Sequence, residues 1–360
     1  MFNLVIIVAV VLIIAIIYTI FRVSTLISIA KGDSKERIPS SNKAQATLMV
    51  LFLVAGLFGF FYYSFGGLDD SFIQPLASKH GAETDLWFWI TMGVTCFVFI
   101  LTQILLFGFS YKYQYQKDRK ADFYPHNNKL ELIWTAIPAV VLAFLVLTGW
   151  KIWTDITGPA PQDAYVIEVF GYQYGWTFRY PGADGKLGDY DYLRIDTQGN
   201  DLGIDLTDPN AHDDFISNQL YLPKDKSVLL KIRARDVIHS VYMPHFRSQM
   251  NAVPGLPTKF HFVPTLTTEE MRTQTGNEKF NYELVCNKIC GRSHFGMKAI
   301  IVVQEEEDFK QWYQDQEAWL KLNPDYMSQV PDDLKEVAII SAGLENIGNN
   351  QSVQTQPTSF

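Results

Sequence analysis

The sequence is poor in cysteine and, over long stretches, has no charged residues. Three cysteines among 360 residues exclude a small domain held together by several disulfides. No Asp, Glu, Lys or Arg occurs in residues 1–21, 44–68, 86–111 and 132–150. Because a helix needs about 20 apolar residues to cross a bilayer, these stretches exclude a fully soluble chain and predict four transmembrane helices.

The first uncharged stretch also allows a secretory signal peptide. It lacks a positively charged start and a clear small-residue cleavage site, and both absences favour a retained helix. Pro138 lies in the fourth stretch, where it would kink a helix without preventing it from spanning the membrane.

Charges between the stretches predict the orientation of the chain. Lysines and arginines fill the loops after the first and third stretches, whereas the loop after the second carries Lys79 against four acidic residues. Positively charged loops stay on the cytoplasmic side, so the chain beyond Trp153 is predicted to lie outside the cytoplasm. We expect a multi-pass membrane protein with its C-terminal domain outside the cytoplasm.

Alternating apolar and polar residues dominate the chain beyond residue 164 and indicate β-strands. These patterns, separated by Pro- and Gly-rich turns, occur at 164–170, 227–233, 259–264, 280–285 and 298–303. Many short strands of this kind favour an antiparallel sandwich or barrel.

The C-terminal part has a different pattern. Residues 305–322 predict one helix with an apolar face. That face would contain Phe309, Trp312, Trp319 and Leu320. The composition of residues 347–360 is typical of a disordered tail.

One short segment concentrates possible metal ligands. Cys286 and Cys290 lie four residues apart, and His294 and Met297 follow them. Thiolate and thioether sulfur are soft ligands that suit copper, as imidazole does. His239, at the end of another predicted strand, would complete a set larger than one tetrahedral zinc needs. A disulfide is the alternative in an oxidising compartment, but it leaves the histidine and methionine spacing unexplained.

The other histidines and the third cysteine have no such neighbours. Cys96 lies in an apolar run and is expected to pack as a small hydrophobic residue. Structural or surface roles are expected for His80, His126, His212, His245 and His261.

Four segments resemble subunit II of haem–copper cytochrome c oxidases. "CNKICGRSHFGM" (286–297) resembles the family's Cys-x-x-x-Cys-Gly-x-x-His-x-x-Met loop, and "DVIHSVYMPHFRSQMNAVPG" (236–255) resembles the segment with its first histidine. "FGYQYGWTFRYPG" (170–182) resembles its aromatic segment, and "ELIWTAIPAVVLAF" (131–144) its second membrane helix. The resemblance implies a cupredoxin-like Greek-key barrel that carries a dinuclear CuA centre.

The resemblance also implies how two copper ions would be held. The implied ligands are two bridging thiolates, two imidazoles, a thioether and one backbone carbonyl, from Cys286, Cys290, His239, His294, Met297 and Lys288. The family often has glutamate at position 288, where the side chain helps bind magnesium at the junction with subunit I. A lysine ammonium cannot ligate magnesium, so this contact is not expected here.

Two further roles are implied by position. The aromatic segment resembles the place of electron input from cytochrome c; the family usually has tryptophan where this chain has Tyr174, and Trp176 matches a second ring. A packed aromatic strand is the alternative for Trp176. Glu131 matches a carboxylate that marks a proton-uptake entrance, and a first-turn acid that stabilises the helix dipole is its alternative.

The implied function is that of the electron-accepting subunit of a terminal oxidase. Electrons from cytochrome c would pass through CuA to haem in subunit I, for reduction of oxygen to water coupled to proton pumping. Expected partners are subunits I and III, cytochrome c or a c-type cytochrome domain, and the membrane, with no nucleic acid. The alternatives are a copper-free subunit II of a quinol oxidase and a membrane-tethered copper carrier or assembly factor.

The expected organisation has five parts. Two additional transmembrane helices (1–68) would dock further subunits or a larger respiratory supercomplex. The other parts are the transmembrane hairpin typical of the family (86–153), a periplasmic cupredoxin CuA domain (160–304), a C-terminal helical extension (305–346) and a disordered tail (347–360).

An acidic segment interrupts the predicted strands. Residues 184–214 carry nine aspartates against Lys186 and Arg194. Such a surface would steer a basic electron donor at rates that depend on salt. A solvated loop or a calcium site is the alternative. The sequence has no Cys-x-x-Cys-His motif, so no c-type haem is expected on this chain.

Overall fold

The chain forms two compact units. The computed structural model describes residues 2–31, 34–66, 74–116 and 119–344. One unit contains the described residues of 1–72 and 90–139, and the other those of 73–89 and 140–360. The tail predicted at 347–360 lies outside the described residues.

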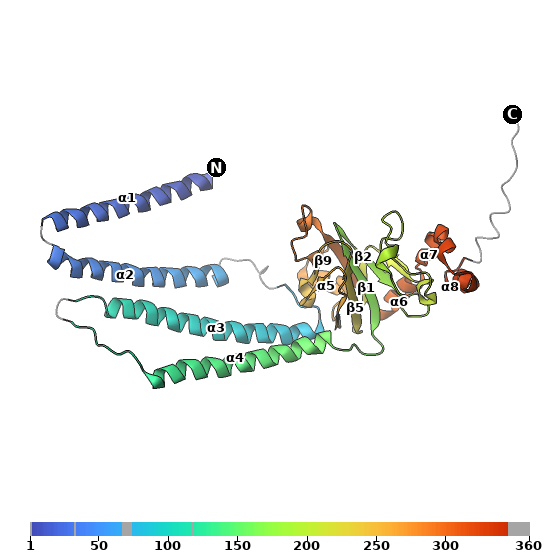
Figure 1. Cartoon of the computed structure of the whole chain (residues 1–360), viewed down its shortest axis with the longest axis horizontal. Coiled ribbons are helices and arrows are strands. Elements are labelled where there is room, and N and C mark those ends of the chain that lie inside the picture. Colours follow the sequence, from blue (N-terminus) through green and yellow to red (C-terminus); the bar gives the residue numbers. More distant parts are fainter. Residues whose placement is uncertain (1, 32–33, 67–73, 117–118, 345–360) are drawn as a thin grey trace, which may run out of the picture. The chain divides into compact units, whose positions relative to one another are not determined.

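Four long helices correspond to the four uncharged stretches (Figure 1). They are α1 (Phe2–Ala30), α2 (Ser34–Phe61), α3 (Lys79–Lys112) and α4 (Asn128–Thr157). A π-helical turn (Tyr62–Gly66) follows α2, and Pro138 lies inside α4 without ending it. In the part of the chain that the structure describes, four helices are long and apolar enough to cross a membrane. The predicted number of transmembrane helices is therefore confirmed.

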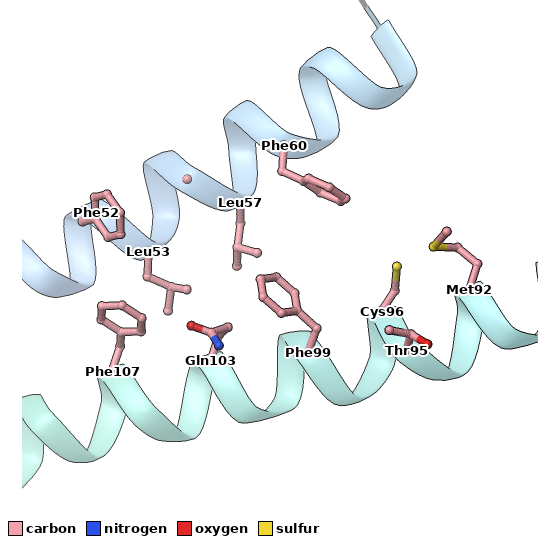
Figure 2. A pocket seen from close by; sticks show the side chains of 11 residues that line it. Phe52, Leu53, Leu57, Phe60, Met92, Thr95, Cys96, Phe99, Gln103 and Phe107 are labelled. Atoms are coloured by element: carbon pink, nitrogen blue, oxygen red, sulfur yellow. The ribbon is translucent and has the colours of Figure 1, made fainter. Parts of the chain in front are cut away.

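An apolar groove of about 470 Å³ lies between α2 and α3. The rings of Phe52 and Phe107 meet at one end, with centroids 6.3 Å apart, and the groove widens toward Phe60 and Met92 (Figure 2). Cys96 lines the groove among apolar side chains, as expected for a small hydrophobic residue.

The residues that follow the fourth helix form two five-stranded sheets. Their strand orders are β3-β2-β1-β5-β8 and β4-β10-β9-β6-β7. The strands are β1 (Tyr165–Tyr172), β2 (Gly175–Tyr180), β3 (Phe215–Ser217), β4 (Leu220–Pro223), β5 (Val228–Ala234), β6 (His239–Met243), β7 (Ser248–Ala252), β8 (Thr258–Phe262), β9 (Tyr282–Cys286) and β10 (Lys298–Gln304). The five patterned segments of the sequence are all strands, namely β1, β5, β8, β9 and β10.

Most strand pairs are antiparallel, as expected of an antiparallel sandwich or barrel, but two pairs are parallel. β1 pairs in parallel with β5, and β10 with β4. The chain passes from one sheet to the other after β3, β4, β5, β7 and β8, and such crossovers place strands that are distant in sequence beside one another. Inward-facing side chains of both sheets, including Phe178, Leu230 and Ile301, share one buried core.

Short helices surround the sheets. They are α5 (Thr268–Thr275), α6 (Glu306–Gln314), α7 (Trp319–Leu322) and α8 (Lys335–Ser341), and Figure 1 shows the last three beside the sheets. The single helix predicted over 305–322 is wrong, because α6 ends before Asp315 and α7 begins at Trp319.

The helix breaks here because α6 and α7 pack into different hydrophobic cores. Phe309 of α6 lies against the ring of Tyr165, and Trp312 packs on the core between the sheets. Trp319 and Leu320 of α7 belong to a second apolar core. One straight helix could not place both groups of side chains.

The second core joins the acidic segment to the C-terminal extension. Leu202, Ile204 and Leu206 of the segment are buried with Trp319 of α7 and Phe170 of β1. Part of the segment is therefore folded onto the first sheet, while residues such as Tyr192 and Leu193 stay exposed.

Buried charges fix this segment to the sheet. Arg179 of β2 donates to Glu168 of β1 at 2.6 Å and to Asp214 at 3.0 Å, and Arg233 of β5 also donates to Glu168. The same Arg233 donates to the carbonyl of Leu202 at 2.8 Å. Burial alone would raise the pKa of Glu168, but the two guanidinium groups outweigh it and lower this pKa to about 2. Glu168 is therefore a carboxylate at neutral pH.

The start of α3 belongs to the unit that contains the two sheets. The Ala77 N–H donates to the carbonyl of His245 at 2.8 Å, and Arg247 donates to Asp85 of α3 at 2.7 Å. These bonds hold the first turns of α3 to the connection between β6 and β7.

Candidate metal centre

Neighbouring strand ends bring the predicted ligands together. β6 begins at His239 and β9 ends at Cys286, and the two strands pair so that Val241 lies opposite Cys286. The loop between β9 and β10 contains the other ligands. His239 is close to this loop, although distant in sequence, because β6 and β9 are adjacent antiparallel strands.

The donor atoms of the predicted ligands converge. The Sγ atoms of Cys286 and Cys290 are 3.9 Å apart. The Nδ1 atom of His239 lies 3.9 Å from Cys286 Sγ, and that of His294 lies 3.6 Å from Cys290 Sγ. Met297 Sδ is 3.8 Å from Cys290 Sγ. The ligand atoms of His239 and the two cysteines all lie within 4.8 Å of one another, as a metal site requires.

The donor group is buried except at one edge. His239, Met297 and both cysteines are buried, whereas His294 is half-buried. Apolar side chains stand on the surface beside that edge, with Ile289 86% and Phe295 87% exposed. The ligand closest to solvent is therefore surrounded by exposed apolar residues.

Asp236 orients the imidazole of His239. Its Oδ1 lies 2.9 Å from His239 Nε2, and its Oδ2 accepts the backbone N–H of Gln173 at 2.8 Å. Because Nδ1 of the ring faces the thiols, this network assigns the proton to Nε2. Asp236 and Gln173 are absent from the predicted site residues, although a carboxylate three residues before His239 was a visible signal.

The chemistry of the donor set fits copper. Cys286 and Cys290 are free thiols, and the thioether of Met297 suits copper rather than zinc. Each imidazole lies beside a different thiol, an arrangement suited to two ions that share both sulfurs. Burial and the neighbouring Cys286 raise the pKa of the Cys290 thiol to about 11. Metal binding must therefore displace a proton from this site.

The two aromatic residues implied in electron input occupy different environments. Trp176 is buried, and its ring lies 5.9 Å from that of His239 in a T-shaped arrangement. Tyr174 is 41% exposed, and its hydroxyl accepts the backbone N–H of Arg292 in the ligand loop at 3.1 Å. Trp176 thus contacts a ligand from inside the domain, and Tyr174 covers the loop from outside.

The backbone carbonyl of Lys288, rather than its side chain, is the group that approaches the site. The Lys288 carbonyl lies 3.2 Å from Cys286 Sγ. The residue as a whole is exposed, and in the described part of the chain its ammonium forms no ion pair. The carbonyl contact of residue 288 therefore does not depend on its side chain.

Glu131 lies in the first turn of α4, in the other unit. Its Oε1 accepts the backbone N–H of Asn127 at 3.4 Å, while the Asn127 side chain accepts the N–H of Leu130 at 3.0 Å. These bonds favour a role in starting the helix. A proton entrance at Glu131 stays a prediction.

The other histidines do not join the ligand group among the described residues. His245 is packed between the rings of Phe280 and Tyr282, and burial together with Arg247 lowers its pKa to about 4. Burial also lowers the pKa of His261. Neutral packed rings of this kind agree with the structural roles expected of them.

Most of the aspartates in the acidic segment stabilise turns. The carboxylate oxygen accepts the backbone N–H two residues further on at Asp184, Asp191, Asp196, Asp205 and Asp208. Aspartate favours such turns because its short side chain reaches its own backbone. The acidity of this segment therefore has a local structural cause, beside any effect on a partner.

Two family models match the chain. Residues 69–152 match the transmembrane domain of cytochrome c oxidase subunit II, and residues 165–305 match its periplasmic domain. The chain is 32% identical over 251 residues to the alternative cytochrome c oxidase subunit 2 of Bradyrhizobium diazoefficiens, across 69% of this chain and 85% of that protein. It is 26% identical over 281 residues to cytochrome c oxidase subunit 2 of Thermostichus vulcanus, across 70% of this chain and 80% of that protein.

A solved structure is also similar. The periplasmic domain of subunit II of cytochrome oxidase from Bradyrhizobium japonicum is 21% identical, with a TM-score of 0.30, and covers 43% of this chain and 95% of that structure. The predicted fold class, four membrane helices plus an all-β cupredoxin-like domain, is confirmed. By both family models and by the Bradyrhizobium diazoefficiens relative, this chain belongs to the cytochrome c oxidase subunit II family.

Proposed function

We propose that this chain is the electron-accepting subunit of a terminal oxidase. Family membership makes it a subunit of a haem–copper oxidase, which is an oxidoreductase. Beyond this, the proposal is that a c-type cytochrome delivers electrons to a dinuclear copper centre in this chain. Haem in subunit I would then receive them for reduction of oxygen to water, coupled to proton pumping.

The observation that carries the proposal is the placement of each imidazole beside its own thiol. His239 Nδ1 lies 3.9 Å from Cys286 Sγ and His294 Nδ1 lies 3.6 Å from Cys290 Sγ, with the two sulfurs between them. Two copper ions bridged by both sulfurs would share one electron, so its gain or loss would change the ligand geometry little. Met297 Sδ lies 3.8 Å from Cys290 Sγ and the Lys288 carbonyl lies 3.2 Å from Cys286 Sγ, so both groups would be available as weaker ligands.

The protein contributes rigidity and exclusion of water. The ligands lie on paired strands and in the loop that joins two of them, and all but His294 among the side-chain ligands are buried. Asp236 fixes the His239 ring, and Trp176 packs against it. A site held in this way has little freedom to rearrange when its charge changes.

Electron input is proposed at the exposed edge of the site. His294 is the least buried of the side-chain ligands, and Ile289 and Phe295 flank this edge with large exposed apolar surfaces. Tyr174 covers the same loop. A donor that docks on these apolar side chains would come within reach of His294 without direct contact with the buried Trp176.

The proposed setting is the bacterial inner membrane, with the copper domain in the periplasm and with subunits I and III, a c-type cytochrome and the membrane as partners. The boundaries proposed for the parts are 1–68, 86–153, 160–304, 305–346 and 347–360. The two additional helices are proposed to dock further subunits or another respiratory complex.

Copper stoichiometry and spectroscopy test this function. The full-length chain, purified in detergent and loaded with copper, is expected to bind two ions per chain. Its EPR spectrum should show one unpaired electron shared equally by two coppers. The Cys290→Ser variant should lose this spectrum, because the second bridging sulfur is missing.

The alternatives give different results. One copper per chain with a localised electron would favour a membrane-tethered copper carrier or assembly factor. Zinc uptake without stable copper binding would exclude both the electron-accepting subunit and the copper carrier or assembly factor.

A further inference from the structure

Gln173 is connected by hydrogen bonds to two parts of the ligand set: directly to the loop that contains Cys290, and through Asp236 to His239. It belongs to the two-residue turn between β1 and β2, where Tyr172 pairs with Gly175. Its side-chain Nε2 donates to the carbonyl of Cys290 at 2.6 Å. Its backbone N–H donates at 2.8 Å to Asp236, whose other oxygen lies 2.9 Å from His239 Nε2. One residue of the first sheet therefore links the ligand loop to the strand that begins at His239.

Among the described residues, the side-chain amide of Gln173 is the hydrogen-bond donor to the Cys290 carbonyl. No backbone N–H in the described ranges is bonded to the Cys290 carbonyl. The next residue, Gly291, has a φ of +138°, which side-chain-bearing residues rarely adopt. The orientation of the Cys290–Gly291 peptide therefore depends on Gln173 rather than on a regular strand or helix.

The turn is packed tightly on the loop. A Cβ atom placed on Gly291 would lie 2.3 Å from the Tyr174 hydroxyl and 3.1 Å from Gln173 Nε2. This close approach leaves little space for the loop to move toward the turn. The Gln173 bond also restrains it from moving away.

From these contacts we infer that Gln173 is a positioning residue for the copper centre. It holds the Cys290 peptide, and through Asp236 the His239 ring, in the arrangement that presents both a thiol and an imidazole to the metal. The inference rests on the proposed function for the identity of the metal. Its structural part, the restraint of the ligand loop, applies to the metal-free chain as well.

The test compares three variants of the full-length chain. Gln173→Met keeps the length of the side chain and removes the donor, and Gln173→Glu keeps the shape and replaces the donor with an acceptor. The matched control is Gln249→Met. Gln249 Nε2 donates to Ser240 Oγ at 3.0 Å, so it makes a similar bond beside His239, and among the described residues its side chain forms no hydrogen bond to residues 287–297.

In the metal-free chain, backbone amides of residues 287–297 should exchange hydrogen with solvent about tenfold faster in both Gln173 variants, the effect of one lost hydrogen bond. In the copper-loaded chain, a chelator should remove copper about tenfold faster, and the EPR spectrum should show unequal coppers. Gln249→Met should match the wild-type chain in all three measurements.

The outcomes separate this inference from the proposed function. Unchanged exchange and unchanged copper release in both Gln173 variants would overturn it, as would equal effects of Gln249→Met. Failure of the wild-type chain to bind two coppers would instead refute the proposed function. The exchange measurement would still decide the role of Gln173 in that case.

Discussion

The carboxylate of Asp236 lies 2.9 Å from Nε2 of His239, on the side of the ring opposite the thiols. Asp236 itself is held by the backbone N–H of Gln173 at 2.8 Å. The imidazole that faces the metal site is therefore part of a hydrogen-bonded chain that begins in the other sheet. Its tautomer and orientation are set before a metal binds.

Asp236→Ala should weaken copper binding by about 10- to 100-fold, the usual effect of removing the partner of a ligating histidine. The midpoint potential should rise, since the loss of a nearby negative charge disfavours the more positive, oxidised centre. Chelator competition and a redox titration measure the two effects. Glu283→Gln, which alters a half-exposed pair with Lys298 on β9 and β10, is the control and should change neither value.

Lys288→Ala should leave copper content and the EPR spectrum unchanged. Only the backbone carbonyl of this residue approaches the site, at 3.2 Å from Cys286 Sγ. Met297→Leu removes a side-chain donor from the same loop and should shift the potential, because the axial ligand tunes it. Loss of copper in Lys288→Ala would contradict the backbone role.

Glu168→Gln should destabilise the all-β unit by about 3–5 kcal/mol, because two buried guanidinium groups lose a charged partner. The pKa of Glu168 is lowered in the folded state from 4.5 to about 2. Its contribution to stability is therefore present above pH 4.5 and is lost as the pH falls from 4.5 to 2. Denaturant unfolding followed by fluorescence, repeated across this range, should show a shallower acid dependence in the variant than in the wild-type chain.

Trp319→Ala should loosen the acidic segment although it lies in the C-terminal extension. Trp319 is buried with Leu202 and Ile204, and truncation of a buried tryptophan costs about 3–5 kcal/mol. Hydrogen exchange should accelerate at residues 200–206. The exposed Val337→Ala, on α8 of the same extension, should leave these amides unchanged.

Asp184, Asp191 and Asp196 allow a test of electrostatic steering that keeps the turns. Each accepts a backbone N–H through one oxygen, and asparagine offers the same acceptor without the charge. The triple Asp→Asn variant should fold normally. If the segment steers a basic cytochrome c, reduction at low ionic strength should slow by about threefold and depend less on salt. Equal rates in both proteins at every ionic strength would show that these charges serve the turns alone.

The sequence predicts the elements with the strongest patterns. The four membrane helices and the strands β1, β5, β8, β9 and β10 follow from uncharged stretches and alternation. Strands β3 and β4 are too short for a clear period. In β2, the inward-facing Trp176, Phe178 and Tyr180 alternate with Thr177 and Arg179, which is a strand pattern; the pattern does not reveal that Arg179 is buried as well.

The convergence of the proposed ligand residues was predictable because metal chemistry restricts residue types, and Cys286 to Met297 lie within one loop. Gln173 was not, because amides occur everywhere on a surface, and Asp236 offered only the weak signal of a carboxylate three residues before His239. Their roles depend on strand pairing that places the β1–β2 turn against a loop more than 110 residues away, as the separation of 117 between Gln173 and Cys290 shows. The break between α6 and α7 was missed for a similar reason, since the helical pattern does not reveal that its two halves face different cores.

The core shared by residues 202–206 and 319–344 constrains how this protein could have evolved. The acidic segment alone would expose Leu202, Ile204 and Leu206 to water, and the extension alone would expose Trp319 and Leu320. Removal of either segment should therefore destabilise the other. We therefore expect the length of the segment between β2 and β3 to correlate across the family with the length of the chain after β10.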